Sequence, residues 1–525
     1  MDTKALRQKI LDLAIRGKLV PQDPNDEPAS VLLEKIREQK QQMFKEGKLK
    51  KKDIKNDSII FKGEDNLHYE KFQDGTVKCI EDEIPFEIPE GWAWARIFSI
   101  TKDLPYGTAK KSMQTGLVAV LRMGNIQSGE IDYSDLVYSS DIDDIAKYTL
   151  IKNDLLFNRT NSAEWVGKTA IYRGNIPAMY AGYLIRMRAF IDSEYLNVVM
   201  NSGYAKAYCN SVKTDGVNQS NINAQKLGNF LVPIPSPTEQ KRISTNIVDF
   251  IPRISMIQGE KEHIAELILQ MKAKILDLAI RGKLVPQNPD DEPASVLLER
   301  IRAEKEELIK QGKIKRDKKE SIIFKGEDNS YYEKIGSEVR CIDSEIPFDL
   351  PESWMFARLK HIGEVIGGGT PKTNIDEYWD GNIPWLTPAD LSGYEDMHIS
   401  TGARTITELG LKSSSAQLLP ENSILYSSRA PIGYIAIAAN PISTNQGFKS
   451  VVPYNFAMSP YLYYCLKART SDIVRRATGT TFKEISGSEM AETTVPLPPI
   501  NEQQRIFDKA TQLLEVLSTI EKSLN

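Results

Sequence analysis

An internal repeat constrains the fold of this chain more than any other feature. Residues 10–36 (ILDLAIRGKLVPQDPNDEPASVLLEKI) return as residues 275–301 (ILDLAIRGKLVPQNPDDEPASVLLERI), and only three of these 27 positions differ. The segment SIIFKGEDN at 58–66 returns at 321–329. A repeat of this kind sets the domain organisation, and 525 residues are too many for one hydrophobic core. The sequence therefore predicts two similar halves.

The repeat resumes on both sides of two dissimilar segments. IEDEIPFEIPEGWAWARI (80–97) returns as IDSEIPFDLPESWMFARL (342–359), and VPIPSPTEQKRI (232–243) returns as VPLPPINEQQRI (495–506). Between these motifs the similarity nearly vanishes. We call the repeated part the frame and the dissimilar parts the inserts. A frame kept twice around unlike inserts indicates one task done twice by the frame and a different task for each insert.

The second half of the frame carries a heptad pattern. Apolar residues recur at alternating steps of four and three, which is typical of a coiled-coil seam. The intact copy has Ile243, Ile247, Phe250, Ile254, Ile257, Ile264, Ile268, Met271, Ile275 and Leu278. The other copy is divided between the two ends of the sequence: Ile506, Ala510, Leu513, Leu517, Ile520 and Leu524, then Leu6, Ile10 and Leu13.

Twofold symmetry would place the intact helix antiparallel to the two half-helices, seam to seam. The repeat then predicts a pseudo-twofold, circularly closed arrangement. Pro252 lies inside the predicted helix 239–281, and we expect it to kink or interrupt that helix because proline lacks the backbone N–H. The inserts contain short β-rich runs between Gly- and Asn-rich turns, such as TLIKNDLLFNRT and SAQLLPENSILYSSR. NDLLFNR (153–159) resembles ENSILYSSR (421–429).

Composition indicates where in the cell the protein works and how much charge it has for binding. The four cysteines lie far apart and form no CxxC pair, and the N-terminal segment carries charges throughout. These features predict a reduced, cytoplasmic protein without a membrane span. The net charge is −4, whereas proteins that hold DNA by bulk charge are basic. Any DNA contact must therefore come from local patches or be shared with a partner.

The sequence contains no convincing motif of a catalytic site. SAEWVGKT (162–169) nearly matches the phosphate loop GxxxxGK[ST], but Ser162 stands where the first glycine is needed. There is no NPPY-type methyltransferase tetrapeptide, and the four histidines are scattered. We predict no catalytic residues, no metal site and no enzymatic activity in this chain.

The paired motifs carry a family resemblance. IPFEIPEGWAWARI and IPFDLPESWMFARL, with VPIPSPTEQKRI and VPLPPINEQQRI, resemble the conserved regions of the specificity subunits of type I restriction–modification systems. The resemblance implies a non-catalytic subunit that binds double-stranded DNA and two methyltransferase subunits, which the restriction (motor-nuclease) subunits join. It implies no cofactor in this chain, S-adenosylmethionine in the methyltransferase partner, and ATP and Mg in the restriction partner.

The resemblance also gives a fold class and boundaries. The class is mixed α/β, with two globular α/β target recognition domains separated by long antiparallel coiled-coil helices. The boundaries are an N-terminal conserved region at 1–85 (half-helix plus arm), target recognition domain 1 at 86–235, a central conserved region at 236–345 (long helix plus arm), target recognition domain 2 at 346–498, and a C-terminal conserved half-helix at 499–525.

Side chains that read DNA are concentrated in the inserts. Base edges are read by Arg, Lys, Asn and Gln, while phosphates take Lys, Arg, Ser, Thr and backbone N–H groups. By resemblance, the segments around Lys372, Arg429, Gln446 and Lys483 correspond to loops that the family turns toward DNA. The candidates are Tyr106, Thr108, Lys110, Lys111, Arg122, Asn125, Asn158, Arg159, Asn161, Asn218 and Gln219 in the first insert, and Lys372, Thr373, Asn374, Trp385, Ser428, Arg429, Asn445, Gln446, Thr480 and Lys483 in the second.

Alternative interpretations remain open. Asn and Ser in these segments could simply cap turns, and Trp92 and Trp354 fit core anchors better than base-stacking residues. The chain could also be the specificity subunit of another methyltransferase–nuclease class, or a coiled-coil scaffold that does not read DNA. If it reads DNA, two unlike inserts predict an asymmetric bipartite target, with half-sites about one helical turn apart.

Overall fold

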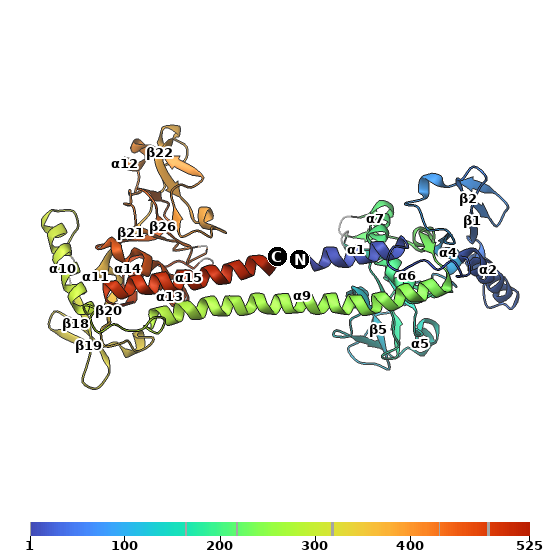
Figure 1. Cartoon of the computed structure of the whole chain (residues 1–525), viewed down its shortest axis with the longest axis horizontal. Helices are drawn as coiled ribbons and strands as arrows, with labels where there is room; N and C mark the ends of the chain where they lie inside the picture. The colour runs from blue at the N-terminus through green and yellow to red at the C-terminus, as the bar shows by residue number, and fades with distance from the viewer. Residues whose placement is uncertain are drawn as a thin grey trace. The chain divides into compact units, whose positions relative to one another are not determined.

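The computed structural model describes residues 2–162, 165–216, 219–316, 320–429, 431–479 and 483–524. The chain forms two compact units, residues 1–261 and residues 262–525, which Figure 1 shows in the colours of the chain order. The division falls inside α9 (Pro237–Ile280), so this helix contributes to both units. The mixed helix and strand content confirms the predicted α/β class. Within the described ranges, no helix is both long and apolar enough to cross a bilayer.

Unit 1 alternates helices with short strands. Its helices and 3-10 turns before α9 are α1 (Thr3–Ile15), α2 (Ala29–Lys45), α3 (Lys51–Ile54), η1 (Glu81–Glu83), α4 (Ile97–Ile100), η2 (Met123–Asn125), α5 (Ile142–Tyr148), α6 (Ser193–Met200), α7 (Gly203–Val212) and α8 (Ala224–Gly228). Its strands are β1 (Ser58–Lys62), β2 (His68–Phe72), β3 (Val77–Cys79), β4 (Ala93–Arg96), β5 (Val118–Leu121), β6 (Ile126–Gln127), β7 (Gly129–Ile131), β8 (Val137–Ser139), β9 (Leu155–Asn158), β10 (Thr160–Asn161), β11 (Thr169–Ile171), β12 (Ala178–Tyr180), β13 (Leu184–Met187), β14 (Thr214–Asp215), β15 (Ser220–Asn221) and β16 (Leu231–Ile234).

Unit 2 follows a similar order. After α9 its helices and 3-10 turns are α10 (Ala294–Lys310), η3 (Asp343–Glu345), α11 (Leu359–Ile362), η4 (Asp376–Tyr378), η5 (Pro388–Leu391), α12 (Glu408–Lys412), η6 (Phe456–Met458), α13 (Ser459–Arg476), α14 (Gly487–Ala491) and α15 (Ile500–Leu524). Its strands are β17 (Ser321–Lys325), β18 (Tyr331–Ile335), β19 (Glu338–Cys341), β20 (Met355–Arg358), β21 (Gly363–Gly367), β22 (Trp379–Leu386), β23 (His398–Ile399), β24 (Arg404–Ile406), β25 (Ile424–Tyr426), β26 (Ile435–Ala438), β27 (Ser443–Thr444), β28 (Lys449–Pro453) and β29 (Thr494–Leu497).

The same strand pairing closes each insert. In unit 1, β4 pairs antiparallel with β16, with Arg96 opposite Leu231. In unit 2, β20 pairs antiparallel with β29, with Arg358 opposite Thr494. The pairing brings the start of each insert next to its end. This explains why the motifs around residues 93–97 and 231–234 are both kept in the repeat.

Each unit also contains a three-stranded antiparallel meander, which belongs to the frame, and a five-stranded sheet. The meanders have the order β1-β2-β3 and β17-β18-β19. The five-stranded sheets have the orders β13-β9-β11-β7-β6 and β21-β28-β25-β26-β23. Unit 1 adds the sheets β12-β5-β8 and β10-β15-β14, and unit 2 adds β24-β22-β27. The inserts therefore share a central sheet and differ around it.

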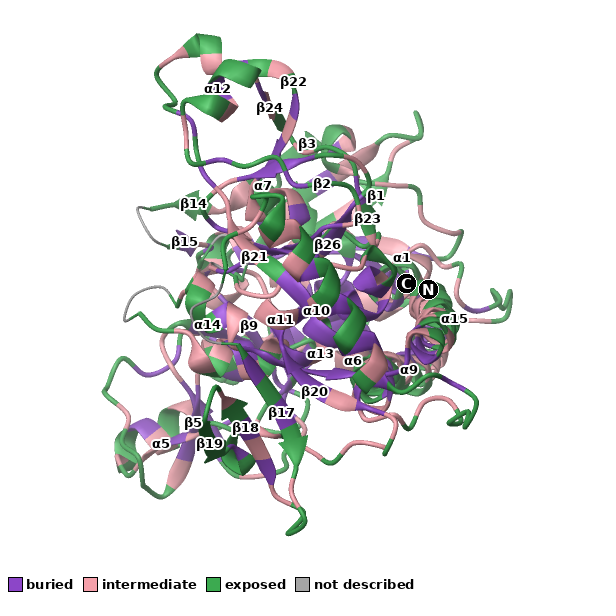
Figure 2. Cartoon of the chain, turned by 90° about the vertical axis from the view of Figure 1, so that its left-hand side faces the viewer, coloured by how far each residue is buried: buried purple, intermediate pink, exposed green. Residues whose placement is uncertain are grey.

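The insert and the frame share one hydrophobic core within each unit. In unit 1 a single cluster contains Leu11 of α1, Phe157 of β9 and Ile243 of α9. In unit 2 the corresponding cluster contains Tyr426 of β25 and Ile506 of α15. Figure 2 shows the burial of each residue, with α12 largely exposed. The frame therefore supplies part of the core of each insert.

The long helix packs antiparallel against a shorter helix in each unit. In unit 1, Gln22 Nε2 lies 2.5 Å from Glu239 Oε1, and Thr3 bonds Gln258. In unit 2, Gln287 Nε2 lies 2.6 Å from Glu502 Oε1, and Lys272 Nζ lies 2.5 Å from Glu521 Oε2. Figure 1 shows α1 beside the N-terminal part of α9, and α15 beside its C-terminal part.

The expected interruption of the long helix does not occur. α9 continues through Pro252 as one helix of 44 residues. Pro252 lies on the exposed side, while Ile247 and Ile254 are 7% exposed. Packing of this buried side offsets the backbone hydrogen bond that proline cannot donate. Three predicted seam residues are exposed in the described chain: Ile264, Met271 and Ile520.

Glycine is required where α1 ends. Gly17 has φ +66°, and an added Cβ would lie 2.4 Å from Pro89 Cγ and 3.1 Å from Trp92 Cζ2. Gly47, after α2, has φ +72° but no atom within 4 Å of such a Cβ. Both glycines therefore have a left-handed backbone conformation, and they differ in whether an added Cβ would clash with a neighbour.

Substituting these two glycines separates backbone strain from steric clash. We expect Gly17→Ala to lower the free energy of unfolding by about 1–3 kcal/mol more than Gly47→Ala, because overpacking is added to the strain common to both. Urea denaturation of the two variants measures the difference. Equal destabilisation would contradict the prediction, since Pro89 would then have moved aside without cost.

Candidate nucleic-acid interface

One buried tryptophan fixes each insert to the frame. Trp92 Nε1 donates to Glu239 Oε2 at 2.9 Å, and Trp354 Nε1 donates to Glu502 Oε2 at 3.0 Å. Burial raises the pKa of both carboxyls, against the hydrogen bonds that Trp92 and Trp354 donate. Both indoles are at most 9% exposed. The prediction that they are core anchors is confirmed.

The candidate residues of the first insert fall into four clusters, at 106–111, 122–125, 158–162 and 218–221. Three of these clusters, all but 122–125, lie together. The guanidinium of Arg159 lies over the ring of Tyr106, 4.6 Å from its centroid. Its Nη2 reaches Asn221 Oδ1 at 3.4 Å, and its Nη1 reaches Gly182 O at 3.3 Å. Gly182 N donates in turn to Thr108 O at 2.7 Å. The loops around residues 106–111, 158–162 and 219–221 therefore converge.

The surface of this group is polar and partly cationic. Lys110, Lys111 and Gln219 are exposed. Lys110 Nζ lies 2.6 Å from Asp141 Oδ2, and the hydrogen bond with Asp141 raises the pKa of the lysine. Asn161 pairs with Ser220 between β10 and β15. Asn218 lies outside the described residues.

The fourth cluster is held by other contacts. Arg122 Nη2 lies 2.9 Å from Asp135 Oδ2. The Asn125 side chain is buried, and its Nδ2 donates to the carbonyls of Asp132 and Asp135 at 2.9 Å each. Asn125 thus shapes the turn after β5 with its side chain. Arg122 remains a half-exposed cation at the edge of that turn.

The predicted clusters of the second insert converge more completely. Thr370 bonds Gln446, and Ser428 N donates to Gly447 O at 2.7 Å. Arg429 forms an isolated β-bridge with Glu484. The loops around residues 369–374, 427–429, 444–447 and 483–484 therefore meet. Thr480 lies outside the described residues.

The exposed side chains of this group are mostly cations and amides. Lys372, Thr373, Asn374, Gln446 and Lys483 are exposed. The side chain of Arg429 is 37% exposed and lies 4.0 Å from a carboxylate oxygen of Glu484. Asn445 is half-buried, and its Oδ1 accepts from Gly447 N at 2.8 Å. We call Lys372, Arg429 and Lys483 the basic trio of unit 2.

Five predicted contact residues are buried: Thr108, Asn125, Asn158, Trp385 and Ser428. Trp385 Nε1 donates to Gly369 O at 2.9 Å, so this ring holds the loop that carries Lys372. A side chain without exposed surface does not reach a base edge while the loops keep this conformation. Burial thus fits a positioning role for these five residues better than the predicted direct contact.

Sequence reasoning did not single out Lys449, and it left the register between the two inserts open. Lys449 lies at the start of β28, with Nζ 3.4 Å from Gln446 O and 3.5 Å from Glu484 Oε1. Its place directly after the Asn445–Gln446 turn was the available signal. Ile222 N donates to Arg159 O, and Ile485 N donates to Ser428 O. Arg159 therefore corresponds to Ser428, and Arg429 lies one position further along.

Comparison with known proteins finds similar chains of one kind. Residues 351–525 match the type I restriction modification DNA specificity domain. The specificity subunit of the type I restriction enzyme EcoAI from Escherichia coli is 27% identical over 98% of this chain and 90% of its own length. The specificity subunit of MjaIX from Methanocaldococcus jannaschii is 48% identical over 30% of this chain and 37% of its own length.

A solved structure has a similar fold. A chain from a study of complex assembly and conformational transition of the type I R-M system superposes with a TM-score of 0.50 and 17% identity, covering 84% of this chain and 94% of that chain. The present chain is therefore similar to specificity subunits of type I restriction–modification systems, in one case along nearly its whole length.

Proposed function

We propose that this chain is the non-catalytic subunit that gives a type I restriction–modification complex its DNA sequence specificity. The supporting observation is that one set of frame contacts recurs around two unlike inserts. Trp92–Glu239 and Trp354–Glu502 hold the inserts in equivalent ways. The exposed loop groups differ, since Tyr106 and Arg159 stack in one insert and the basic trio occupies the other.

Each loop group is proposed to contact one half-site. Arginine, lysine and amide side chains read base edges, and lysines also bind phosphates. The proposed contacts are the exposed and half-exposed residues Tyr106, Lys110, Lys111, Arg122, Arg159, Asn161, Gln219, Lys372, Thr373, Asn374, Arg429, Asn445, Gln446 and Lys483. Unlike inserts make the target asymmetric and bipartite. Lys449 joins this set because of its place beside Gln446.

The frame is proposed to bind the catalytic partners. One surface presented twice fits two copies of one methyltransferase subunit, which carries S-adenosylmethionine, and restriction subunits that use ATP and Mg join that complex. We further propose that α9 pairs with α1 and α15 as an antiparallel coiled coil in a circularly closed, pseudo-twofold frame. We keep the boundaries 86–235 and 346–498 for the two recognition domains.

Exchange of one insert tests this function. Residues 86–235 are replaced by the corresponding insert of another specificity subunit, and the methylated sites of the host genome are sequenced. We expect one half-site to change and the other to stay, because each insert has its own loop group. A matched exchange of residues 346–498 should change the opposite half. If one exchange altered both half-sites, or neither, the inserts would not read the half-sites separately. If the chain were a scaffold, the methylated sites would show no bipartite motif.

A further inference from the structure

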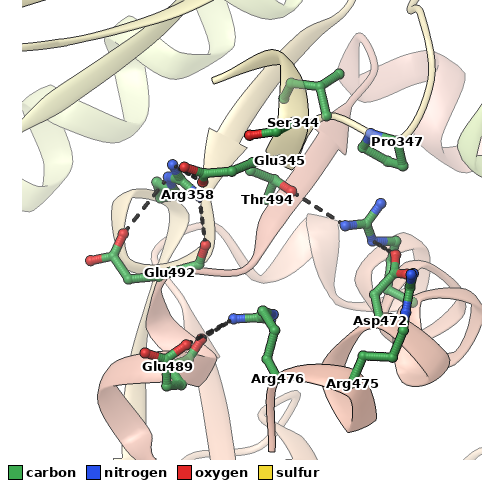
Figure 3. A pocket seen from close by; sticks show the side chains of 12 residues that line it. Ser344, Glu345, Pro347, Arg358, Asp472, Arg475, Arg476, Glu489, Glu492 and Thr494 are labelled. Carbon is green, nitrogen blue, oxygen red and sulfur yellow. Dashed lines mark hydrogen bonds and ion pairs between the residues drawn. The ribbon is translucent and has the colours of Figure 1, made fainter. Parts of the chain in front are cut away.

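Unit 2 contains a polar cavity between the frame and α13 (Figure 3). Its volume is about 460 Å³, and arginines from β20 and α13 line it together with carboxylates. This volume is in the range of ligand sites in proteins. None of the residues proposed above to read DNA lines the cavity. It therefore needs an explanation of its own.

The carboxylates around the cavity already have cationic partners. Glu345 Oε2 accepts from Arg358 Nη2 at 2.6 Å. Glu492 bonds Lys360, and Asp472 pairs with Arg475. Arg358 is held by the frame through further bonds. The acceptors of the lining are thus engaged, whereas guanidinium groups carry more N–H donors than these pairs use.

Arg469 has donor capacity to spare. The residue is only 6% exposed. Its Nη2 donates to Thr494 Oγ1 at 3.3 Å, and its Nε lies 3.1 Å from Asp472 Oδ2 without hydrogen-bond alignment. Among the described residues, Nη1 has no hydrogen-bond partner. A buried donor left unpaired is costly, and Arg469 lines the cavity. Because Nη1 itself has almost no accessible surface, it would meet an acceptor there after a rotation of the guanidinium group.

Arg476 adds a second, partly buried cation, whose Nη1 lies 3.5 Å from Glu489 Oε2. It donates to Glu489 O and to Thr493 Oγ1, both at 2.6 Å. Burial lowers the pKa of Arg476, and the positive charges of Arg469 and Arg358 lower it further, against the opposing effect of Glu489 and Asp472. The arginines therefore repel one another in a partly desolvated place. An anion bound between them would relieve that repulsion.

The equivalent place in unit 1 is filled by aromatic rings. Phe230 takes the place of Thr493, since their carbonyls accept from Ile97 N and Leu359 N respectively. The rings of Tyr204 and Tyr208 each lie 4.9 Å from that of Phe230.

One further contact confirms the correspondence. Tyr208 Oη donates to Lys226 O, as Arg476 donates to Glu489 O. The frame around the two places is the same. The change from packed rings to arginines around a cavity therefore belongs to the second insert.

We propose that this cavity is an oxyanion site that takes a phosphate group, bound by Arg469 and Arg476 with Arg475 at its exposed side. Guanidinium forks match phosphate oxygens in bidentate geometry. The phosphate would come either from inorganic phosphate in solution or from a backbone phosphate of bound DNA. The site goes beyond the proposed reading of bases, because none of its residues belongs to the converging loops.

Phosphate titration of the full-length chain tests the site. Binding of inorganic phosphate is measured by calorimetry at constant ionic strength for the native chain, Arg469→Gln, Arg476→Gln and Lys206→Gln. Lys206 is an exposed lysine on α7 of unit 1, so its variant controls for loss of a charge. We expect each arginine variant to bind phosphate about tenfold more weakly or worse, because a charge-assisted hydrogen bond is lost, and the control to bind as the native chain does.

Two results would overturn the site: no phosphate binding by the native chain, or unchanged affinity in Arg476→Gln. Arg476 is one-third exposed in its side chain, so this variant decides if Arg469→Gln fails to fold. DNA binding across a salt series then separates the sources. A salt slope reduced by about one in Arg476→Gln assigns the site to backbone phosphate; an unchanged slope with lost phosphate binding assigns it to free phosphate. Because phosphate binding is measured without DNA, its failure leaves the proposed specificity function standing.

Discussion

Replacing Glu333 with alanine is expected to lower the free energy of unfolding of unit 2 by about 3–5 kcal/mol, because a buried arginine would lose its main partner. Arg358 is 3% exposed, and its Nη2 donates to Glu333 Oε2 at 2.8 Å. Glu333 also accepts from Ser321 Oγ at 2.6 Å and from Arg340 Nη2 at 2.7 Å. Urea denaturation measures the loss. Glu408→Ala, at an exposed ion pair with Lys412 on α12, is the control and should change stability by no more than about 0.5 kcal/mol.

The same carboxylate gives this prediction a pH dependence. Burial alone would raise the pKa of Glu333, but the hydrogen bonds from Arg358, Ser321 and Arg340 outweigh it and lower that pKa. A lowered folded-state pKa means that the stabilisation is complete above the ordinary glutamate pKa and is lost as the pH falls toward the folded-state value. Glu333→Ala should therefore lose less stability than the native chain when the pH falls below about 4.3. An identical acid profile in both proteins would contradict this account.

Removing the basic trio of unit 2 is expected to weaken binding of target DNA by at least about a hundredfold. The three cations come from separate loops that meet in the structure, and each base contact by such a residue contributes about 1–3 kcal/mol. The variant carries Lys372→Ala, Arg429→Ala and Lys483→Ala together. Fluorescence anisotropy with a duplex containing the methylated target measures its affinity at several salt concentrations. The salt slope should fall by about one for each lost phosphate contact.

A single lysine on the same insert serves as the matched control. Lys412 on α12 is 75% exposed in its side chain and lies outside the converging loops. Lys412→Ala should bind target DNA within about twofold of the native chain, because exposed side chains away from an interface contribute little. An equal loss of binding free energy per removed charge in the trio variant and in this control would mean that bulk charge, and not this loop group, holds the DNA.

The frame was predictable from sequence because its motifs occur twice. Each copy of ILDLAIRGKLVPQ contains a glycine, Gly17 or Gly282, that allows the turn after the helix. The place of the tryptophans at the start of each insert favours a core position. The continuity of α9 through Pro252 was not predictable from the proline alone. It depends on the packing of Ile247 and Ile254, which only the tertiary structure shows.

The candidate interface was predictable in part. Residue type identified loops that converge, since Asn, Gly, Lys and Arg clusters mark polar turns. Residue type did not separate Lys372, which is exposed, from Ser428, which is buried. Arg159 and Arg429 are offset by one position, since Ile222 N donates to Arg159 O whereas Ile485 N donates to Ser428 O. Arg429 accordingly lies beside Glu484 and not on an aromatic ring.

The single core shared by insert and frame limits how such proteins diversify. Tyr195 of the first insert and Ile247 of α9 belong to one buried cluster, so a transplanted insert must bring side chains of matching volume. Closely packed interiors tolerate such mismatches poorly. A newly acquired recognition domain whose buried face does not fit the frame would destabilise the protein, whichever DNA sequence that domain could bind. Recombination between these genes therefore gives useful proteins only where the new domain packs stably against the frame. The DNA sequence that the recombinant protein recognises matters only after that condition is met.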